Sequence, residues 1–134
     1  MTPRDAYEQM RRRWLTDVPT FDAAMLAEDV VLETPFARPG RPTSQTGRDT
    51  VLAYVEAGHA SVPFRFEDCR TLAIHDTTDP ETIVVEYELT ATMKTTGTSA
   101  SAPFIGVLTV HDGRITRWRE YQNTAAIEAA MSGR

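Results

Sequence analysis

The sequence contains few residues that could bind a metal ion or form a disulfide. Its 134 residues include 1 cysteine, Cys69, and 3 histidines. A single cysteine excludes an internal disulfide and fits a reducing compartment, so we expect a cytoplasmic protein. The histidines are scattered and lack carboxylates at ligand spacing, which argues against a metal site. Glycine-rich phosphate loops, serine-centred nucleophile elbows and Cys/His nucleophile pairs are also missing from the sequence.

Positive charge and long apolar runs are scarce as well. Lysine and arginine together number 14 against 19 acidic residues, giving a formal net charge of −5. This balance argues against nucleic acid and anionic membrane surfaces as partners. No apolar run approaches the roughly 18 residues of a membrane span. The first residues are polar and lack the apolar core of a signal peptide, so we expect neither a span nor a signal.

What the sequence does contain is typical of one globular domain. Hydrophobic residues make up 41% and charged residues 25% of the chain, which are ordinary values for a folded domain. A chain of this length can bury about two-thirds of its unfolded surface in a single core. We therefore expect residues 1–134 to form one domain.

Start and stop signals predict four helices. Thr2 and Pro3 open the first, which ends before Pro19. A short second helix is predicted for 20–26, a third for 47–62 and a terminal one for 124–131.

The remaining segments read as strands. They are 29–34, followed by a loop at 35–46, and then a run of four at 64–74, 83–93, 100–110 and 115–123. Helices followed by an antiparallel meander indicate an α+β fold, in which a cone-like, curved, mostly antiparallel sheet wraps around the N-terminal helices.

Alternation in the last strand singles out one carboxylate. One face carries Thr116, Trp118, Glu120 and Gln122, and the other carries Ile115, Arg117, Arg119, Tyr121 and Asn123. Glu120 is thus flanked by an indole and an amide. Two interpretations remain open: a reactive acid in an apolar pocket, or a surface glutamate paired with a neighbouring arginine.

Alternation in the strand before it separates a core face from an outer face. Ile83, Val85, Tyr87, Leu89, Ala91 and Met93 share the face expected to point inward. Glu86 and Glu88 fall on the other face, so we expect them to point outward rather than to form a catalytic pair. The outer face also carries apolar residues, namely Ile105, Val107 and Tyr121. An uncovered apolar face is a liability in a monomer, so we expect a homodimer through it.

The concave side of such a sheet encloses a cone against the first and third helices. Its expected lining is Trp14, Thr34, Val55, Gly58, Phe64 or Phe66, Tyr87, Leu89, Phe104, Trp118 and Glu120. A mostly apolar cavity with few polar groups is the usual profile of a small-molecule site, so the expected partner is a small hydrophobic molecule.

Three motifs carry a family resemblance. They are Leu-Ala-Glu-Asp-Val-Val-Leu-Glu-Thr-Pro-Phe at 26–36, Gly-Arg-Asp at 47–49, and Gly-Arg-Ile-Thr-Arg-Trp-Arg-Glu-Tyr at 113–121. In this order they resemble the nuclear transport factor 2-like superfamily, and within it SnoaL-like polyketide cyclases, ketosteroid isomerases and limonene epoxide hydrolases. The resemblance covers essentially the whole chain and implies a cystatin-like α+β roll. This fold hosts enzymes of several classes and non-catalytic binders, so it does not fix a function.

Two of these chemistries lack residues here. Ketosteroid isomerases place a base aspartate where this chain has Thr34, and an oxyanion-hole aspartate near Gly106. Limonene epoxide hydrolases use an aspartate, an arginine and a second aspartate, and the last of these matches Glu120. The favoured register puts Tyr87 and Leu89 at the other two positions, whereas a register shifted by one puts Glu86 and Glu88 there. Neither register supplies the arginine, which leaves Arg11 on the first helix as a candidate replacement.

SnoaL-like cyclases are similar to what remains, because they use one acid/base residue in a hydrophobic pocket without a metal or an organic cofactor. The resemblance therefore implies Glu120 as the catalytic residue. The expected substrate-binding residues are Trp14, Thr34, Tyr87, Leu89, Phe104, Trp118 and Gln122. His59 either balances a helix dipole or belongs to the site. A non-catalytic binding protein and a subunit that only associates with another protein remain alternatives.

Overall fold

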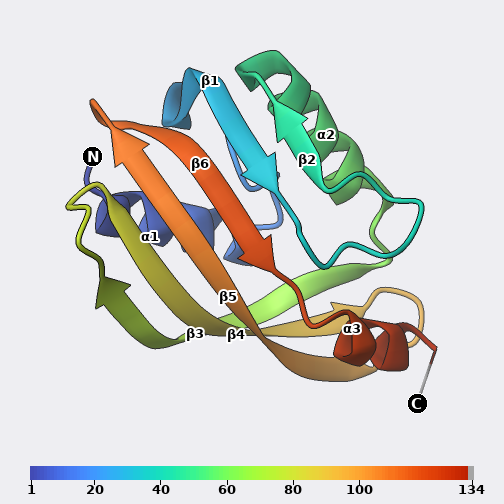
Figure 1. Cartoon of the computed structure of the whole chain (residues 1–134). Helices are drawn as coiled ribbons and strands as arrows, with labels where there is room; N and C mark the ends of the chain where they lie inside the picture. The colour runs from blue at the N-terminus through green and yellow to red at the C-terminus, as the bar shows by residue number, and fades with distance from the viewer. Residues whose placement is uncertain (133–134) are drawn as a thin grey trace.

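Six strands form a single curved sheet in the computed structural model, which describes residues 1–132 (Figure 1). The strands are β1 (Leu26–Glu33), β2 (Ser44–Thr46), β3 (Phe64–Asp76), β4 (Thr82–Met93), β5 (Ser99–His111) and β6 (Arg114–Tyr121). The helices are α1 (Pro3–Leu15), the 3-10 turn η1 (Ala23–Met25), α2 (Arg48–Ser61) and α3 (Thr124–Met131). The α+β architecture expected from the sequence is confirmed.

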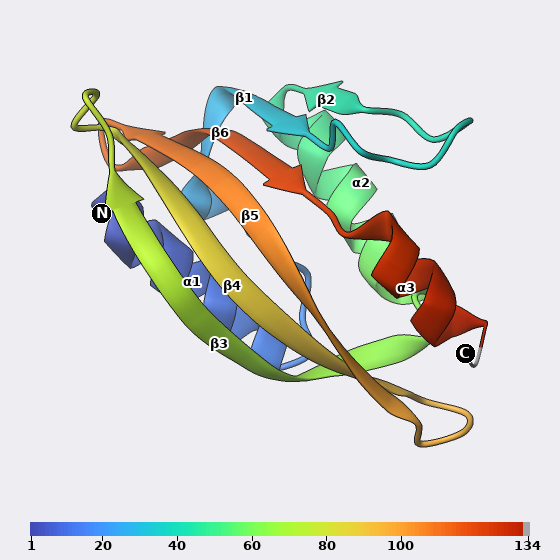
Figure 2. The same ribbon diagram turned by 60° about the horizontal axis from the view of Figure 1, so that its bottom comes forward.

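The strand order places β6 well inside the sheet. That order is β2-β1-β6-β5-β4-β3, with all neighbours antiparallel except the parallel pair β1–β6. Two irregularities interrupt the pairing of β3 with β4, and bulges of this kind increase twist and bend a sheet. Figure 2 shows the resulting curve, with α1 and α2 on its concave side and α3 at the far end of β6.

Helix α1 begins as the sequence predicts and packs onto the sheet. Thr2 accepts a hydrogen bond from the Asp5 backbone N–H, while the Asp5 side chain accepts one from the Thr2 N–H. This reciprocal capping box satisfies two otherwise unpaired donors of the first turn. The apolar stripe of α1 is buried against the sheet and comprises Ala6, Tyr7, Met10 and Trp14.

Three sequence predictions for residues 20–46 need correction. The predicted second helix is a single 3-10 turn, because Asp22 caps only the Met25 N–H and the chain extends immediately afterwards. β1 then starts at Leu26 rather than at 29. The predicted loop 35–46 ends in β2, where Ser44 pairs with Glu33 and closes the free edge of β1.

The predicted face of Ile115 is also wrong. Ile115 is fully buried in the core and pairs with Val110, whereas Arg117 pairs with Thr109. Thr116 is therefore the extra residue of a bulge, and the bulge shifts the alternation by one residue. Beyond it, Trp118 faces the core as predicted, and Glu120 lines the concave side.

The alternation predicted for β4 is confirmed from Ile83 to Leu89, whereas near the end of the strand Thr92 of the outer face is buried and Ala91 and Met93 are only partly buried. Ile83, Val85, Tyr87 and Leu89 are buried. Glu86 and Glu88 face outward, where they meet His75 at 2.6 Å and Arg70 at 3.2 Å. The alternative register that would have turned these two glutamates into the pocket is excluded. Within residues 1–132, no helix combines the length and apolarity that crossing a membrane requires.

Candidate active site

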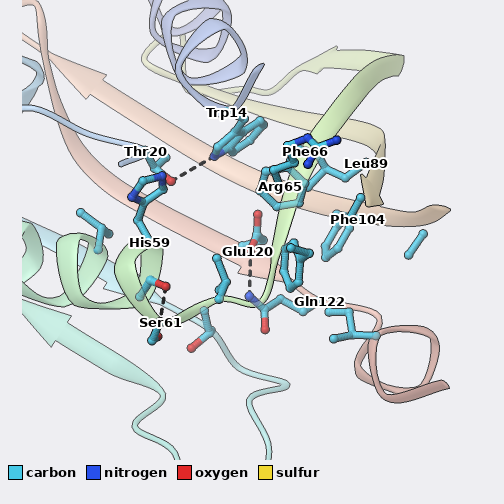
Figure 3. Close-up of a pocket in the computed structure, with 18 of the residues that line it drawn as sticks. Trp14, Thr20, His59, Ser61, Arg65, Phe66, Leu89, Phe104, Glu120 and Gln122 are labelled. Carbon is cyan, nitrogen blue, oxygen red and sulfur yellow. Dashed lines mark hydrogen bonds between the residues drawn. The ribbon is translucent and has the colours of Figure 1, made fainter. Parts of the chain in front are cut away.

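A cavity of about 880 Å³ lies between the concave face of the sheet and the helices. This volume is within the range of about 300–1,000 Å³ seen for small-molecule sites. Its walls come from the end of α1, the second half of α2, the adjoining ends of β3, β4 and β5, the inner face of β6, and α3. Figure 3 shows side chains from these elements converging on the same space.

Glu120 supplies the carboxyl group in this cavity. It lies on β6 opposite Gly106 of β5. Its Oε2 accepts a hydrogen bond from the Tyr87 hydroxyl. Its Oε1 accepts one of 2.9 Å from the Gln122 amide, which Figure 3 shows. Throughout residues 1–132, no lysine, arginine or histidine forms an ion pair with Glu120. The carboxyl group is thus held by two neutral donors and not by a cation.

This environment shifts the pKa values of both Glu120 and Tyr87. Burial raises the pKa of Glu120, and the hydrogen bonds from Tyr87 and Gln122 oppose that shift without cancelling it. The pKa of Tyr87 lies well above its ordinary value, first because the phenol is buried and then because the negative charge of Glu120 is close. Tyr87 therefore stays protonated and donates, while Glu120 keeps its proton to higher pH than an exposed glutamate.

Aromatic rings surround Tyr87, the phenol that bonds Glu120. The Tyr87 ring stacks on Trp14 at 5.3 Å, on Phe104 at 5.7 Å and on Trp118 at 6.3 Å between ring centroids. The Trp14 indole N–H is satisfied by the Thr20 hydroxyl at 3.0 Å. This packing buries the Tyr87 side chain and sets the position from which its hydroxyl bonds Glu120.

Gly106 is required by the indole that forms the cavity wall. A Cβ atom at this position would lie 2.0 Å from Cη2 of Trp118. The Trp118 ring therefore occupies the space that a side chain at position 106 would need.

The structure brings most of the predicted site residues together. Those that line the cavity are Trp14, Thr34, Leu89, Phe104, Trp118, Glu120 and Gln122. Tyr87 is fully buried and is not among the lining residues. It reaches the cavity only through its hydrogen bond to Glu120, so its role is to position that carboxyl group.

Arg11 does not replace the missing hydrolase arginine. Its Nε donates to the Cys69 carbonyl at 2.8 Å, and its guanidinium pairs with Glu8. Glu8 belongs to α1 and Cys69 to the edge strand β3. Arg11 itself is not among the residues that line the cavity. The candidate replacement named from the sequence is therefore wrong.

The sequence missed several polar residues of the cavity. Arg65 of β3 reaches it while pairing with Glu67 at 2.8 Å. Asp17 was missed as well: it lines the cavity and bonds at 3.1 Å to His59 of α2, which the sequence left open as a site residue and which also lines the cavity. Asp17 lies 42 residues away along the chain, so no local pattern signals this pair. Across residues 1–132, no group of three or more His, Cys, Asp or Glu side chains is arranged to hold a metal ion.

Comparison with known proteins assigns the fold to a family. Residues 5–118 match the model of the SnoaL-like domain. The chain belongs to the SnoaL-like family. The match ends two residues before Glu120, so the case for that residue rests on the geometry above.

Individual relatives of this SnoaL-like domain agree with the assignment. A PhzA/B-like protein of Pseudomonas aeruginosa is 29% identical over 103 residues, covering 77% of this chain and 71% of the relative. The structure of a candidate isomerase from Bacillus subtilis superposes with a TM-score of 0.85 at 20% identity, covering 98% of this chain and 94% of the other. A Delta 5-3-ketosteroid isomerase from Mycobacterium sp. gives 0.72 at 23% identity, covering 94% and 97%. These likenesses show a shared nuclear transport factor 2-like fold.

Proposed function

We propose that this SnoaL-like protein is a cofactor-independent enzyme that transfers protons by acid/base catalysis. Its substrate is a small hydrophobic molecule bearing a carbonyl or an epoxide, and the reaction is a cyclisation, isomerisation or hydration. Glu120 is the catalytic residue, and Trp14, Leu89, Phe104 and Trp118 form the binding walls. We place the enzyme in the cytoplasm, where the single thiol of Cys69 stays reduced.

One observation carries this proposal: Glu120 enters a large, mostly apolar cavity, and no cationic side chain among residues 1–132 pairs with it. By contrast, Glu33 on the outer face of the neighbouring strand pairs with Arg117 at 3.3 Å. A carboxyl group of raised pKa can donate a proton near neutral pH. Positioned proton transfer of this kind contributes on the order of 10²–10⁴-fold in rate.

The surrounding polar groups support an assignment of roles. Tyr87 and Gln122 hold the two carboxyl oxygens and leave the acid oriented toward the cavity. Thr34, which follows β1, also lines the cavity. Its hydroxyl donates to the Pro42 carbonyl at 3.4 Å, so in this proposal it helps to orient the substrate by accepting a hydrogen bond. In this proposal Glu120 protonates the carbonyl or epoxide oxygen as charge develops on it.

The test replaces the acid by its neutral isostere. We expect Glu120→Gln to abolish consumption of styrene oxide, cyclohexenone or related small epoxides and ketones, followed by mass spectrometry. Gln can still accept the Tyr87 hydrogen bond, so the fold and the melting temperature should stay near wild type. The matched control is Glu86→Gln on the outer face of β4, which should leave turnover unchanged. Wild-type turnover in the Glu120→Gln protein would remove Glu120 from the mechanism.

The same cavity also supports a second candidate, a non-catalytic binding protein. In that case Glu120→Gln changes ligand affinity modestly, and no compound is consumed by the wild-type protein. A subunit used only for association predicts a cavity filled by its own side chains. The open volume of about 880 Å³ argues against that third candidate.

A further inference from the structure

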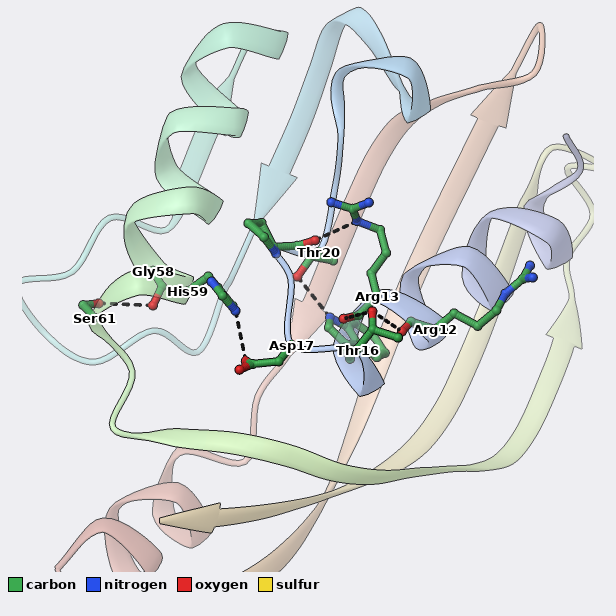
Figure 4. A network of polar contacts seen from close by, with 10 residues as sticks. Arg12, Arg13, Thr16, Asp17, Thr20, Gly58, His59 and Ser61 are labelled. Atoms are coloured by element: carbon green, nitrogen blue, oxygen red, sulfur yellow. Dashed lines mark hydrogen bonds and ion pairs between the residues drawn. The ribbon is translucent and has the colours of Figure 1, made fainter. Parts of the chain in front are cut away.

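A second titratable pair faces the cavity from the helical side. His59 lies in the last turn of α2 and Asp17 in the segment after α1, and both line the cavity. His59 Nε2 is 3.1 Å from Asp17 Oδ1. Figure 4 shows the two side chains meeting between α1 and α2, and Figure 3 shows His59 and Glu120 on different walls of one pocket.

The hydrogen bond fixes which imidazole nitrogen is basic. A carboxylate only accepts hydrogen bonds, so Nε2 must carry the proton that it shares with Asp17. In the neutral ring, Nδ1 then keeps its lone pair. Within residues 1–132, no hydrogen bond occupies Nδ1 of His59. His59 thus lines the cavity with an imidazole whose Nδ1 takes part in no hydrogen bond among the described residues.

Asp17 is held firmly enough to orient a base. Its φ of 56° places it in the left-handed region, which is uncommon for a residue other than glycine. The turn around it is fixed by the hydrogen bond from Val18 N–H to the Arg13 carbonyl at 3.3 Å. The Arg13 side chain in turn donates to the Pro19 carbonyl at 2.7 Å (Figure 4). About half of the Asp17 side chain is exposed, so protons can exchange with water at this end of the cavity.

We propose that His59 is the catalytic base that works with Glu120 as the acid, and that Asp17 is its positioning residue. This inference rests on the proposed function and narrows the substrate to carbonyl compounds with an acidic C–H bond next to the carbonyl. His59 Nδ1 takes the proton from carbon, and the electron pair of that C–H bond forms a C=C bond. The π electrons of the C=O bond move to oxygen, which takes the proton of Glu120. The product is an enol, and no oxidant or reductant is needed.

A substrate-independent probe tests the base. In 5-nitrobenzisoxazole, removal of the C–H proton by a base forms a nitrile and breaks the N–O bond, releasing a coloured phenolate. We expect the wild-type protein to accelerate this reaction and His59→Gln to lower kcat at least tenfold. Gln retains an N–H donor for Asp17, and thermal unfolding confirms that the variant is folded. The matched control is His75→Gln, whose imidazole pairs with Glu86 at 2.6 Å on the outer face and whose loss should leave kcat unchanged.

Two further measurements separate catalysis from packing. Added imidazole should restore the rate in His59→Ala, which a merely structural histidine would not allow. Asp17→Asn keeps an acceptor in a residue that tolerates left-handed backbone, so kcat should fall several-fold while KM stays constant. Equal rates in wild type and His59→Gln, or no acceleration by the wild type, would overturn the assignment of His59.

The two proposals fail in different ways. Loss of the probe reaction in Glu120→Gln together with full activity in His59→Gln would make Glu120 the base. That result overturns the role of His59 and leaves Glu120 as the proton-transfer group. Unchanged turnover of carbonyl and epoxide substrates by Glu120→Gln would overturn the proposed function instead.

Discussion

At the residue scale, opposing effects act on the carboxyl group of Glu120. Burial favours the neutral acid, whereas the donors on Tyr87 and Gln122 favour the carboxylate. Burial is the larger effect, so the folded protein holds this proton more tightly than the unfolded chain. The same balance makes Glu120 an acid for catalysis and a destabilising group once it ionises.

The stability of the protein should therefore depend on pH through Glu120. Because its pKa is raised on folding, Glu120 stabilises the folded state below its unfolded pKa of about 4.3, and this contribution is lost as pH rises through the folded pKa. At pH 7 we expect Glu120→Gln to unfold at the same temperature as wild type or higher. The difference should disappear toward pH 4. Thermal unfolding of both proteins across this range checks the expectation, and a clear loss of stability of the variant at pH 7 would contradict it.

Tyr87 should act on Glu120 without touching a ligand. Tyr87→Phe removes a hydrogen bond that lowers the pKa of Glu120, so we expect that pKa to rise further. Loss of the bond should also cost about 0.5–1.5 kcal/mol of unfolding free energy.

Tyr7→Phe is the matched control for Tyr87→Phe. Tyr7 is an equally buried phenol that bonds Thr71 at 2.7 Å and makes no hydrogen bond to the carboxyl group of Glu120. Both variants should lose similar stability, but only Tyr87→Phe should move the carbon-13 NMR titration of Glu120. A shift of equal size in the two variants would show that general loosening, and not the hydrogen bond, is responsible.

At the scale of elements, the pairing of β5 with β6 builds the site. Gly106 lies opposite Glu120, and the next inward pair is Leu108 with Trp118. Without a side chain at 106, the indole of Trp118 lies flat over β5 beside the acid. The glycine is thus part of the cavity wall.

Gly106→Ala should consequently be destabilising. The added methyl group overlaps the Trp118 ring, and overpacking of this kind costs typically about 1–3 kcal/mol. The change in the midpoint of urea unfolding would measure this loss of stability. Gly58→Ala is the control, since its Cβ would meet no atom within 4 Å and alanine favours a helix by about 1 kcal/mol. If Gly106→Ala were as stable as wild type, the indole would not be locked over the glycine.

The sequence predicted elements where local patterns are strong. Capping residues located α1, and alternation of apolar residues located both faces of β4. It failed where a single residue changes the register, as with the bulge at Thr116 that turned Ile115 inward. It also failed for β2, because three polar residues form a strand only when the edge of β1 is available to pair with them.

The residues of the candidate site were likewise predicted only where a local pattern indicates them. The alternation of side chains along β6 was enough to place Trp118, Glu120 and Gln122 on one face. The pair of His59 and Asp17 depends on how α1 and α2 approach each other, and one sequence contains no signal for that approach. Tyr87 was assigned to the correct face. How deeply its side chain is buried, however, is set by tertiary packing that the sequence does not reveal.

At the scale of the whole molecule, the outer face of the sheet carries exposed apolar side chains among charged ones. Ile105 is 43% exposed and lies beside Tyr121, whose ring contacts the exposed Phe36. We propose that a second copy of the chain covers this face, and a standard interface would bury about 800 Å² per partner.

Light scattering after size exclusion tests the dimer. We expect twice the chain mass for the wild type, and the mass of one chain for Ile105→Glu, because a charge would be buried at the centre of the interface. The cavity lies on the opposite face of the sheet, so ligand binding by the variant should persist. A monomeric wild-type protein would contradict the proposal.

The central claim is that Glu120 is a neutral acid poised in an apolar cavity. The most direct measurement is a carbon-13 NMR titration of its side-chain carboxyl carbon, assigned by its loss in Glu120→Gln. We expect a midpoint clearly above the value of about 4.3 for an exposed glutamate, because burial outweighs the two hydrogen bonds. A midpoint at or below that value would mean that Glu120 is a solvated carboxylate near neutral pH, which would contradict its role as the proton donor.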